Sequence, residues 1–288
     1  MLRRLINLAG SMVVWTADWL GEHVSRLFGR PQPSKCMVLA YHSVPAEQRS
    51  LFIRQMDLLL RQAKVVHADV EGLPEPGKRY AVITFDDGYE DVVDNALPEL
   101  EKRGVPSTIF VVTELLGCDR SWEHRGGEST SRAKLMSRDQ LISLQPELVR
   151  IGSHTMTHAF LPHLDDGKLH EEISGSRAKL ERLLNREVSL FAFPYGAFDE
   201  KVIAGCREAG YTRVFTALPV FAFSERGEFI TGRVGAAPTD WQIEFRLKLA
   251  GAYRWLPQAY ELKRQIREAL RARKVKSVQV DATQKRVA

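Results

Sequence analysis

Two carboxylates and two imidazoles in this sequence have the types and spacing needed for chemistry on a metal ion. Asp86 and Asp87 are adjacent and follow an apolar run, and His154 and His158 lie four residues apart behind another such run. Adjacent carboxylates at a strand end point in different directions, so one can bind a metal while the other stays free as a base. Imidazoles at this spacing can meet on one face of a helix or in a tight turn, which suits two ligands of one ion.

Other interpretations of the acidic pair stay open when it is taken alone. Aspartate is favoured at a helix N-cap, and an Asp-Asp-Gly segment also fits an aspartyl nucleophile or a magnesium pair at a phosphate site. A phosphatase leaves His154 and His158 unexplained, whereas a His-His-Asp site uses both. Mixed nitrogen and oxygen ligation favours Zn²⁺ or a similar divalent ion. Five further histidines are interpreted as solvated or packing residues, with the last two as reserve candidates: His23, His67, His124, His163 and His170.

Short β-prone runs alternate with helical segments through the central part of the chain. The β-prone runs are residues 37–41, 81–85, 107–112, 148–151, 190–193 and 213–216. The helical segments are residues 91–103, 139–144, 168–184 and 199–209. This alternation predicts an α/β fold with a largely parallel sheet and helices outside it, either open or closed into a barrel. Chemistry in such folds collects at the carboxyl ends of strands, where the polar clusters stand.

A third polar cluster, residues 191–199, places Pro194, Tyr195 and Gly196 after a β-prone run. Taken alone, this cluster indicates only a strand-to-helix loop. In chain order, the three clusters together resemble the polysaccharide deacetylase family, which is carbohydrate esterase family 4 with its NodB-homology domain. The similarity spans about residues 36–245. It implies a single-domain, distorted (β/α) barrel of the NodB-homology type that removes acetyl groups from N-acetylated sugars.

The resemblance assigns a role to each residue that matches a family motif. Asp86 matches the catalytic base of the family. Asp87, His154 and His158 match its metal ligands, which implies a bound Zn²⁺ or a similar divalent ion. Tyr195 matches a loop tyrosine whose backbone N–H helps to bind the oxyanion.

Two positions depart from the family pattern. Ala192 stands where the third motif often has an arginine that braces the base, and Arg233 is our candidate substitute, with a surface arginine as the alternative. The late Leu-x-His motif that supplies the general acid in many members is absent, because no histidine follows His170. His42 instead resembles the acid of a permuted branch, similar to poly-N-acetylglucosamine deacetylases, in which this histidine comes from the N-terminal strand.

We therefore expect a metal-dependent N-deacetylase that acts on a polysaccharide or its lipid-linked precursor during exopolysaccharide or cell-envelope modification. The motifs describe only the reacting centre, so the identity of the glycan, and the choice between N-acetyl and O-acetyl groups, stay open. The alternative is a non-catalytic saccharide-binding or scaffolding protein on the same fold, which the missing motif arginine makes plausible.

The basic surplus of the chain is confined to its two ends. The 288 residues include 41 Lys and Arg against 36 Asp and Glu, a formal net charge of +5. Residues 1–35 hold five basic and two acidic residues and residues 262–288 hold nine and two, which leaves 27 and 32 for residues 36–261. An acidic body argues against a nucleic-acid partner. We divide the chain into an N-terminal helix with its linker (1–35), the deacetylase-like domain (36–261) and a basic tail (262–288).

The N-terminal segment is predicted to form an amphipathic helix over about residues 5–28. Its apolar stretch is interrupted by polar residues and is too short and polar to span a bilayer. Two interpretations are open: a terminal helix packed on the domain, or an in-plane membrane anchor with interfacial tryptophans. In the second, the basic tail, residues 263–286, would help to grip an anionic membrane surface.

The location is inferred from the same segment and from the cysteines. Cys36, Cys118 and Cys206 are far apart and form no C-x-x-C pair, which argues against a disulfide framework or a thiolate zinc site. Together with the lack of a cleavable signal, they favour peripheral association with the cytoplasmic face of a membrane. Anchoring on the outer face is the alternative.

Overall fold

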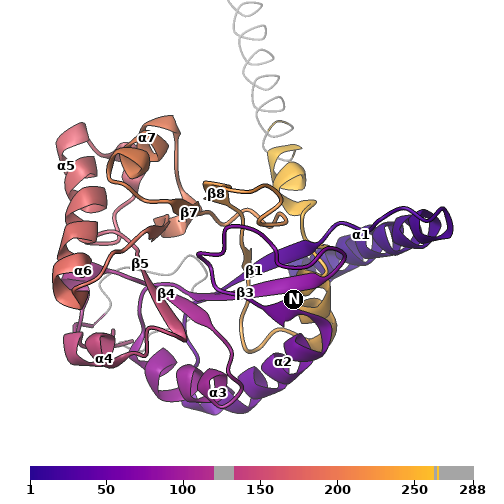
Figure 1. The fold of residues 1–288 in the computed structure, drawn as a ribbon, viewed down its shortest axis with the longest axis horizontal. Helices are drawn as coiled ribbons and strands as arrows, with labels where there is room; N and C mark the ends of the chain where they lie inside the picture. The colour runs from indigo at the N-terminus through magenta and orange to yellow at the C-terminus, as the bar shows by residue number, and fades with distance from the viewer. Residues whose placement is uncertain (120–132, 263–264, 266–288) are drawn as a thin grey trace, which may run out of the picture.

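The computed structural model describes residues 1–119, 133–262 and 265. Its central element is a curled sheet in which every strand pairing within these residues is parallel (Figure 1). The strands are β1 (Lys35–Tyr41), β2 (Lys64–Val65), β3 (Arg79–Phe85), β4 (Ser107–Val111), β5 (Val149–Ser153), β6 (Leu190–Ala192), β7 (Arg213–Phe215), β8 (Ile230–Thr231) and β9 (Val234–Gly235). All six predicted strands are present, so the predicted α/β fold with a parallel sheet is confirmed.

The two edge strands of the sheet, β8 and β9, are joined by two residues that we call the seam. The strand order runs β8-β7-β6-β5-β4-β3-β1-β9, and only Gly232 and Arg233 separate β8 from β9 in the chain. Three peptide steps span about 11 Å at most, so the sheet has to curl until its edges nearly meet. A side chain at Gly232 would collide with the backbone of Leu218, so only glycine fits this crossing. The expected distorted barrel is confirmed, with the seam as its closure.

Helices surround this sheet on its outer face (Figure 1). They are α2 (Arg49–Gln62), α3 (Leu97–Glu101), α4 (Arg138–Ser143), α5 (Asp166–His170), α6 (Ser176–Leu184), α7 (Glu200–Glu208) and α8 (Gln242–Leu249). The predicted segments 91–103 and 168–184 are helical but each contains a π-helical turn, at Val92–Ala96 and Glu171–Gly175. Helices α2 and α8 were not predicted, although α2 buries Phe52, Met56 and Leu59 at the spacing of one helix face.

The sheet buries both of its faces. Met37, Leu39 and Tyr41 of β1 pack in the larger core cluster, which also contains apolar residues of the helices. Cys36 and Val38 alternate with them and pack in a smaller cluster drawn mainly from strands, including Phe110, Leu190, Ala192 and Phe215. Since neighbouring residues of a strand point to opposite faces, the smaller cluster is the interior of the curled sheet.

The predicted N-terminal helix is present as α1 (Leu2–Leu27), which packs on α8 and on residues 254–260. Its polar contacts with the body run from Arg4 to Glu244, from Ser11 to Trp255 and from Asp18 to Arg254. Leu8 and Val14 of the same side pack against the core. Within the described residues, no helix has the length and apolar character needed to cross a membrane. Apart from Leu262 and Gln265, the predicted basic tail lies outside the described residues. Cys36, Cys118 and Cys206 are all free thiols.

Candidate metal centre and active site

Asp87, His154 and His158 form one buried cluster at the carboxyl edge of the sheet. Asp87 follows β3 by two residues and His154 directly follows β5. Ligand atoms of the three residues lie within 4.8 Å of one another. Oδ1 of Asp87 is 3.5 Å from Nε2 of His154 and 3.3 Å from Nε2 of His158. The two motifs, 67 residues apart in the chain, are thus brought together because parallel strands end at the same edge.

The donor set fits a divalent ion such as Zn²⁺. Two ligands bound at roughly 2.1 Å by a tetrahedral ion lie about 3.4 Å apart, which is close to both observed separations. Nδ1 of His154 donates a hydrogen bond to the carbonyl oxygen of Ala192 at 2.7 Å, which leaves the Nε2 lone pair for a metal. Burial lowers the pKa of His154 to about 4, so this imidazole is neutral at pH 7.

The two histidines lie in a tight turn, not on a helix. Thr155 and His158 adopt positive φ angles of 69° and 64°, and Asp87 does so at 69°. Such left-handed backbone costs of order 1–3 kcal/mol in residues other than glycine, so surrounding contacts have to hold it. One of these contacts is local, because Oγ1 of Thr155 accepts a hydrogen bond from the His158 N–H at 3.0 Å.

A buried carboxylate, Glu172, holds the turn that carries His154 and His158. It accepts hydrogen bonds from the N–H groups of Met156 and Thr157 at 2.9 and 3.0 Å and from the Thr157 hydroxyl at 2.5 Å. Glu172 lies on the π-helical segment Glu171–Gly175, and this role had no signal in the sequence. Its three bonds leave the turn little freedom to move the histidines apart.

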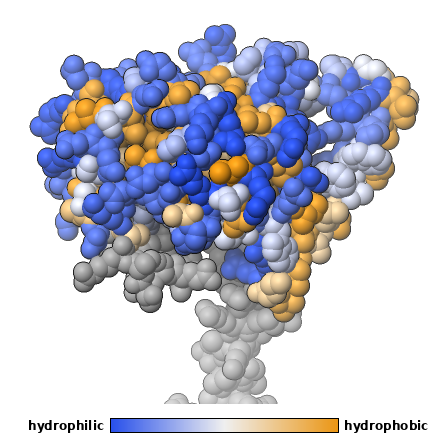
Figure 2. All heavy atoms as spheres, turned by 90° about the horizontal axis from the view of Figure 1, so that it is seen from below, coloured by the Kyte–Doolittle hydropathy of each residue, from blue (hydrophilic) through white to orange (hydrophobic). Residues whose placement is uncertain are grey.

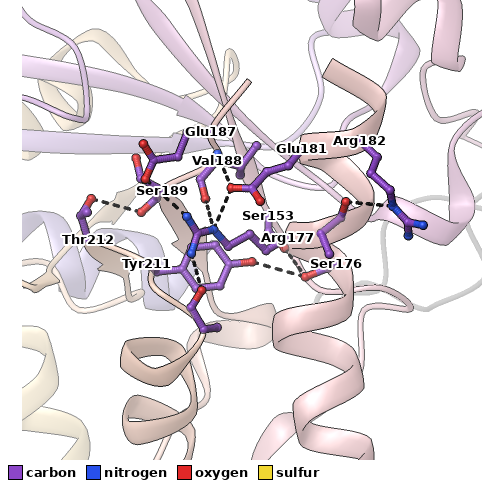
Figure 3. Close-up of polar contacts among 12 residues, drawn as sticks. Ser153, Ser176, Arg177, Glu181, Arg182, Glu187, Val188, Ser189, Tyr211 and Thr212 are labelled. Atoms are coloured by element: carbon purple, nitrogen blue, oxygen red, sulfur yellow. Dashed lines mark hydrogen bonds and ion pairs between the residues drawn. The ribbon is translucent and has the colours of Figure 1, made fainter. Parts of the chain in front are cut away.

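A second layer of hydrogen bonds supports the start of the turn. Ser153 Oγ accepts from the Thr155 N–H at 3.2 Å and shares a 2.7 Å hydrogen bond with Ser176 Oγ. Figure 3 shows Ser176 and Tyr211 side by side beneath Ser153. Both of their hydroxyls donate to the carbonyl of Ile173, at 2.9 and 3.1 Å. The polar network of the figure thus connects the turn to α6 and to the start of β7.

Asp86 points into the curled sheet and is held by Arg233. The guanidinium donates to both carboxylate oxygens, at 2.6 and 2.9 Å, and also to the Thr216 carbonyl and the Thr84 hydroxyl. Arg233 is only 2% exposed, although arginine is a long, charged side chain. Burial by itself raises the pKa of Asp86, but Arg233, with His154 and His42, more than offsets it and holds the pKa below its usual value. The carboxylate is therefore ionised.

The seam explains how Arg233 reaches this place. Ala192 is fully buried in the interior cluster and carries no charge. Arg233 instead enters at the seam, between the edges of β8 and β9, with its guanidinium 5.3 Å from the centre of the Phe110 ring. The predicted alternative, a surface arginine, is therefore wrong.

His42 and Tyr195 flank the cluster on its open side. His42 is exposed and directly follows β1, and its charge lowers the pKa of both Asp86 and Asp87, as expected for a neighbour of the two carboxylates. Tyr195 has a positive φ of 60°, and its hydroxyl lies 3.2 Å from Nδ1 of His158. The sequence predicted only a backbone role for Tyr195, so this side-chain contact is an addition.

The reserve histidines do not join the buried cluster. His163 is exposed and contacts Phe160 in a tilted arrangement, with 4.5 Å between the ring centroids. His170 is exposed on α5, with its Nδ1 3.3 Å from the hydroxyl of Ser174. The supporting residues that the sequence did not indicate, such as Glu172 and Ser153, bind backbone N–H groups of the turn that carries the two ligand histidines.

Comparisons with known proteins agree with this geometry. The sequence pattern of the family described as "Polysaccharide deacetylase" matches residues 74–214. YxkH of Bacillus subtilis, whose name provisionally assigns it to the polysaccharide deacetylases, is 24% identical over 72% of this chain and 73% of its own. The Poly-beta-1,6-N-acetyl-D-glucosamine N-deacetylase of Staphylococcus epidermidis is 28% identical over 48% of each chain.

The solved structures include a similar fold. IcaB from Ammonifex degensii superposes with a TM-score of 0.61 at 27% identity, over 77% of this chain and 98% of that one. The motifs, the barrel and the metal-ligand geometry thus agree with the sequence matches, all of which make the chain similar to the polysaccharide deacetylase family.

Proposed function

We propose that this protein is a divalent-metal-dependent hydrolase that removes acetyl groups from N-acetylated sugars of a polysaccharide or its lipid-linked precursor. The observation that carries the proposal is the buried Asp87, His154 and His158 cluster beside an ionised Asp86. The name of the Staphylococcus epidermidis relative supports an N-acetylated glucosamine polymer as the substrate class. A metal bound by the cluster would supply Lewis-acid polarisation of the acetyl carbonyl and a water of lowered pKa.

In this mechanism Asp86 is the general base that accepts the proton of the attacking water. Arg233 occupies one lone pair of each carboxylate oxygen and fixes the plane of the group, while the other lone pairs stay available. The N–H of Tyr195 stabilises the oxyanion that forms from the carbonyl. His42 donates a proton to the departing amine, because an amide nitrogen leaves poorly as an anion. Its exposed position at the edge of the site suits contact with the sugar.

The non-catalytic alternative rested on the missing motif arginine. Arg233 forms an ion pair with Asp86, the proposed base, and this supports an enzyme over a saccharide-binding protein. The two are separated by incubating the zinc-loaded protein with N-acetylglucosamine oligomers and candidate lipid-linked sugars, and measuring the mass loss of one acetyl group. We expect deacetylation by the native protein and none by Asp86→Asn with metal still bound. Glycan binding without acetate release, by a protein of verified metal content, would favour the alternative.

A further inference from the structure

Helix α1 is attached to the body by its more polar side, on which Leu8 and Val14 are the apolar residues that pack against the core. Its two carboxylates both point inward: Asp18 binds Arg254 through two hydrogen bonds of 2.5 and 2.6 Å, and Glu22 binds Lys35 at 2.7 Å. Arg4 and Ser11 make the contacts to α8 and Trp255 described above. A helix on a water-soluble domain normally buries its broad apolar stripe, whereas α1 places only Leu8 and Val14 against the core and leaves most of its apolar residues exposed.

The opposite side of α1 is apolar and exposed along the whole helix. At 100° per residue, one face consists of Leu2, Leu5, Ile6, Ala9, Met12, Val13, Thr16, Trp19, Leu20, His23, Val24 and Leu27, all of them exposed. We call this set the outward face. Along the described length of α1, the outward face contains no Asp, Glu, Lys or Arg. Figure 2 shows apolar side chains gathered on the right, the side on which α1 projects in Figure 1.

The two polar side chains of the outward face are already hydrogen-bonded within the helix. Thr16 donates from Oγ1 to the carbonyl of Met12, and His23 Nδ1 bonds the carbonyl of Trp19, each at 2.8 Å. Transfer of this face out of water therefore leaves little unsatisfied hydrogen bonding. At 26 residues the face is about 39 Å long, far more than the scattered apolar residues of an ordinary surface.

The charges beside the outward face are basic. Arg3, Arg26 and Arg30 are exposed at or beyond the margins of α1, whereas both acidic residues of the segment face the body. Trp19 and the neighbouring Trp15 are half-exposed, and tryptophan prefers the boundary between headgroups and acyl chains. An apolar stripe with a basic margin complements an anionic lipid surface better than it complements another polar protein surface.

We propose that α1 is an in-plane membrane anchor, with its outward face inserted at the headgroup and acyl-chain boundary of an anionic bilayer. The anchor is independent of the proposed chemistry. Arg4 lies at the carboxyl edge of the sheet, where it donates to the Thr239 carbonyl, and Glu22 lies at the amino ends of β1 and β3. Because α1 thus runs along the side of the barrel, the bound protein lies on its side and its active-site edge opens along the membrane surface.

Vesicle flotation of the full chain tests the anchor, with phosphatidylcholine vesicles with and without phosphatidylglycerol. The variant Val13→Asp/Leu20→Asp places two carboxylates in the outward face, at positions 71% and 53% exposed. We expect the native chain to float with anionic vesicles. The variant should bind these vesicles at least about tenfold more weakly. The matched control, Leu60→Asp/Ile142→Asp, changes apolar residues that are 42% and 53% exposed on α2 and α4, and should float like the native chain. Equal melting temperatures establish that all three chains are folded.

Three results would overturn the anchor. In the first, the native chain stays in solution with both vesicle types. In the second, the Val13→Asp/Leu20→Asp variant floats as well as the native chain, which would assign binding to another segment such as residues 262–288. The third is a dimer in analytical ultracentrifugation that the variant dissociates, without any flotation of the native chain. In that case a second copy of the chain covers the outward face.

Discussion

Replacement of Arg233 by methionine tests whether the buried ion pair with Asp86 holds the site together. Methionine keeps an apolar stem against Phe110 and Phe215 but loses every donor. The variant therefore leaves the Asp86 carboxylate, whose side chain is 7% exposed, without the two hydrogen bonds that Arg233 donates. The Thr216 carbonyl and the Thr84 hydroxyl lose a donor as well.

The expected loss of stability follows from this burial. Breaking a buried ion pair by removing one partner costs about 3–5 kcal/mol, because the remaining charge stays desolvated. In a domain of 150–250 residues each kcal/mol lowers the melting temperature by about 2–4 °C, so Arg233→Met should lower it by about 6–20 °C. Arg233→Lys keeps the positive charge but cannot donate to both carboxylate oxygens at once. Its melting temperature should therefore lie between those of the native protein and Arg233→Met.

Thermal unfolding by circular dichroism, in the presence of a chelator, measures this effect without a contribution from metal binding. The matched control is Arg226→Met, because Arg226 is 86% exposed in its ion pair with Glu71 and should change stability by less than about 0.5 kcal/mol. In Asp86→Asn/Arg233→Met both charges are gone, so this variant should be more stable than Arg233→Met by about 1 kcal/mol or more. If Arg233→Met melts like the control, or if the losses of the single variants simply add, the ion pair does not organise the site.

Four further predictions concern the acid, the supporting carboxylate, the metal and pH. His42→Ala should retain zinc but lose about 10²–10⁴-fold in deacetylation rate, and an unchanged rate would exclude it as the acid. Glu172→Gln should weaken zinc binding about 10- to 100-fold in a chelator competition, while Glu171→Gln on the exposed neighbour should not. Chelation should abolish acetate release, and added Zn²⁺ should restore it in the native protein but not in His154→Ala. Glu99, hydrogen-bonded to Arg49, Lys102 and Arg103, has a pKa lowered to about 2, so it stabilises the fold above its unfolded pKa of about 4.5. Glu99→Gln should therefore melt below the native protein at pH 7, with a gap that closes as the pH falls from 4.5 towards 2, and a gap independent of pH would contradict this.

Much of the fold could be predicted because its signals are local. The apolar runs that became β1, β3 and β4 are bounded by polar or turn residues, and the alternation with helical segments requires parallel pairing. Helix α2 was not predicted, although its buried residues follow a helix period. The short strands β8 and β9 have two residues each, which is too few for any period to show.

The candidate ligands were predictable for the same reason. Asp87 and His154 lie within two residues of the ends of β3 and β5, His158 follows in the same turn as His154, and residues there meet at one edge of a parallel sheet. Glu172 could not be found this way, because it contacts backbone N–H groups, and any residue type provides those. Its position depends on how the helical segment at Glu171–Gly175 packs against the turn.

By itself, the sequence determined the donor atoms of the site, the parallel α/β architecture and the existence of two chemically different faces on α1. The tertiary structure decided which arginine meets Asp86, because only the closure of the sheet at Gly232 and Arg233 brings residues 147 positions apart into contact. It also decided which face of α1 the body covers. A periodic pattern defines two faces, but Arg254, Lys35 and Glu244 supply the opposite charges that draw the polar face inward, and this leaves the apolar face in contact with the surroundings.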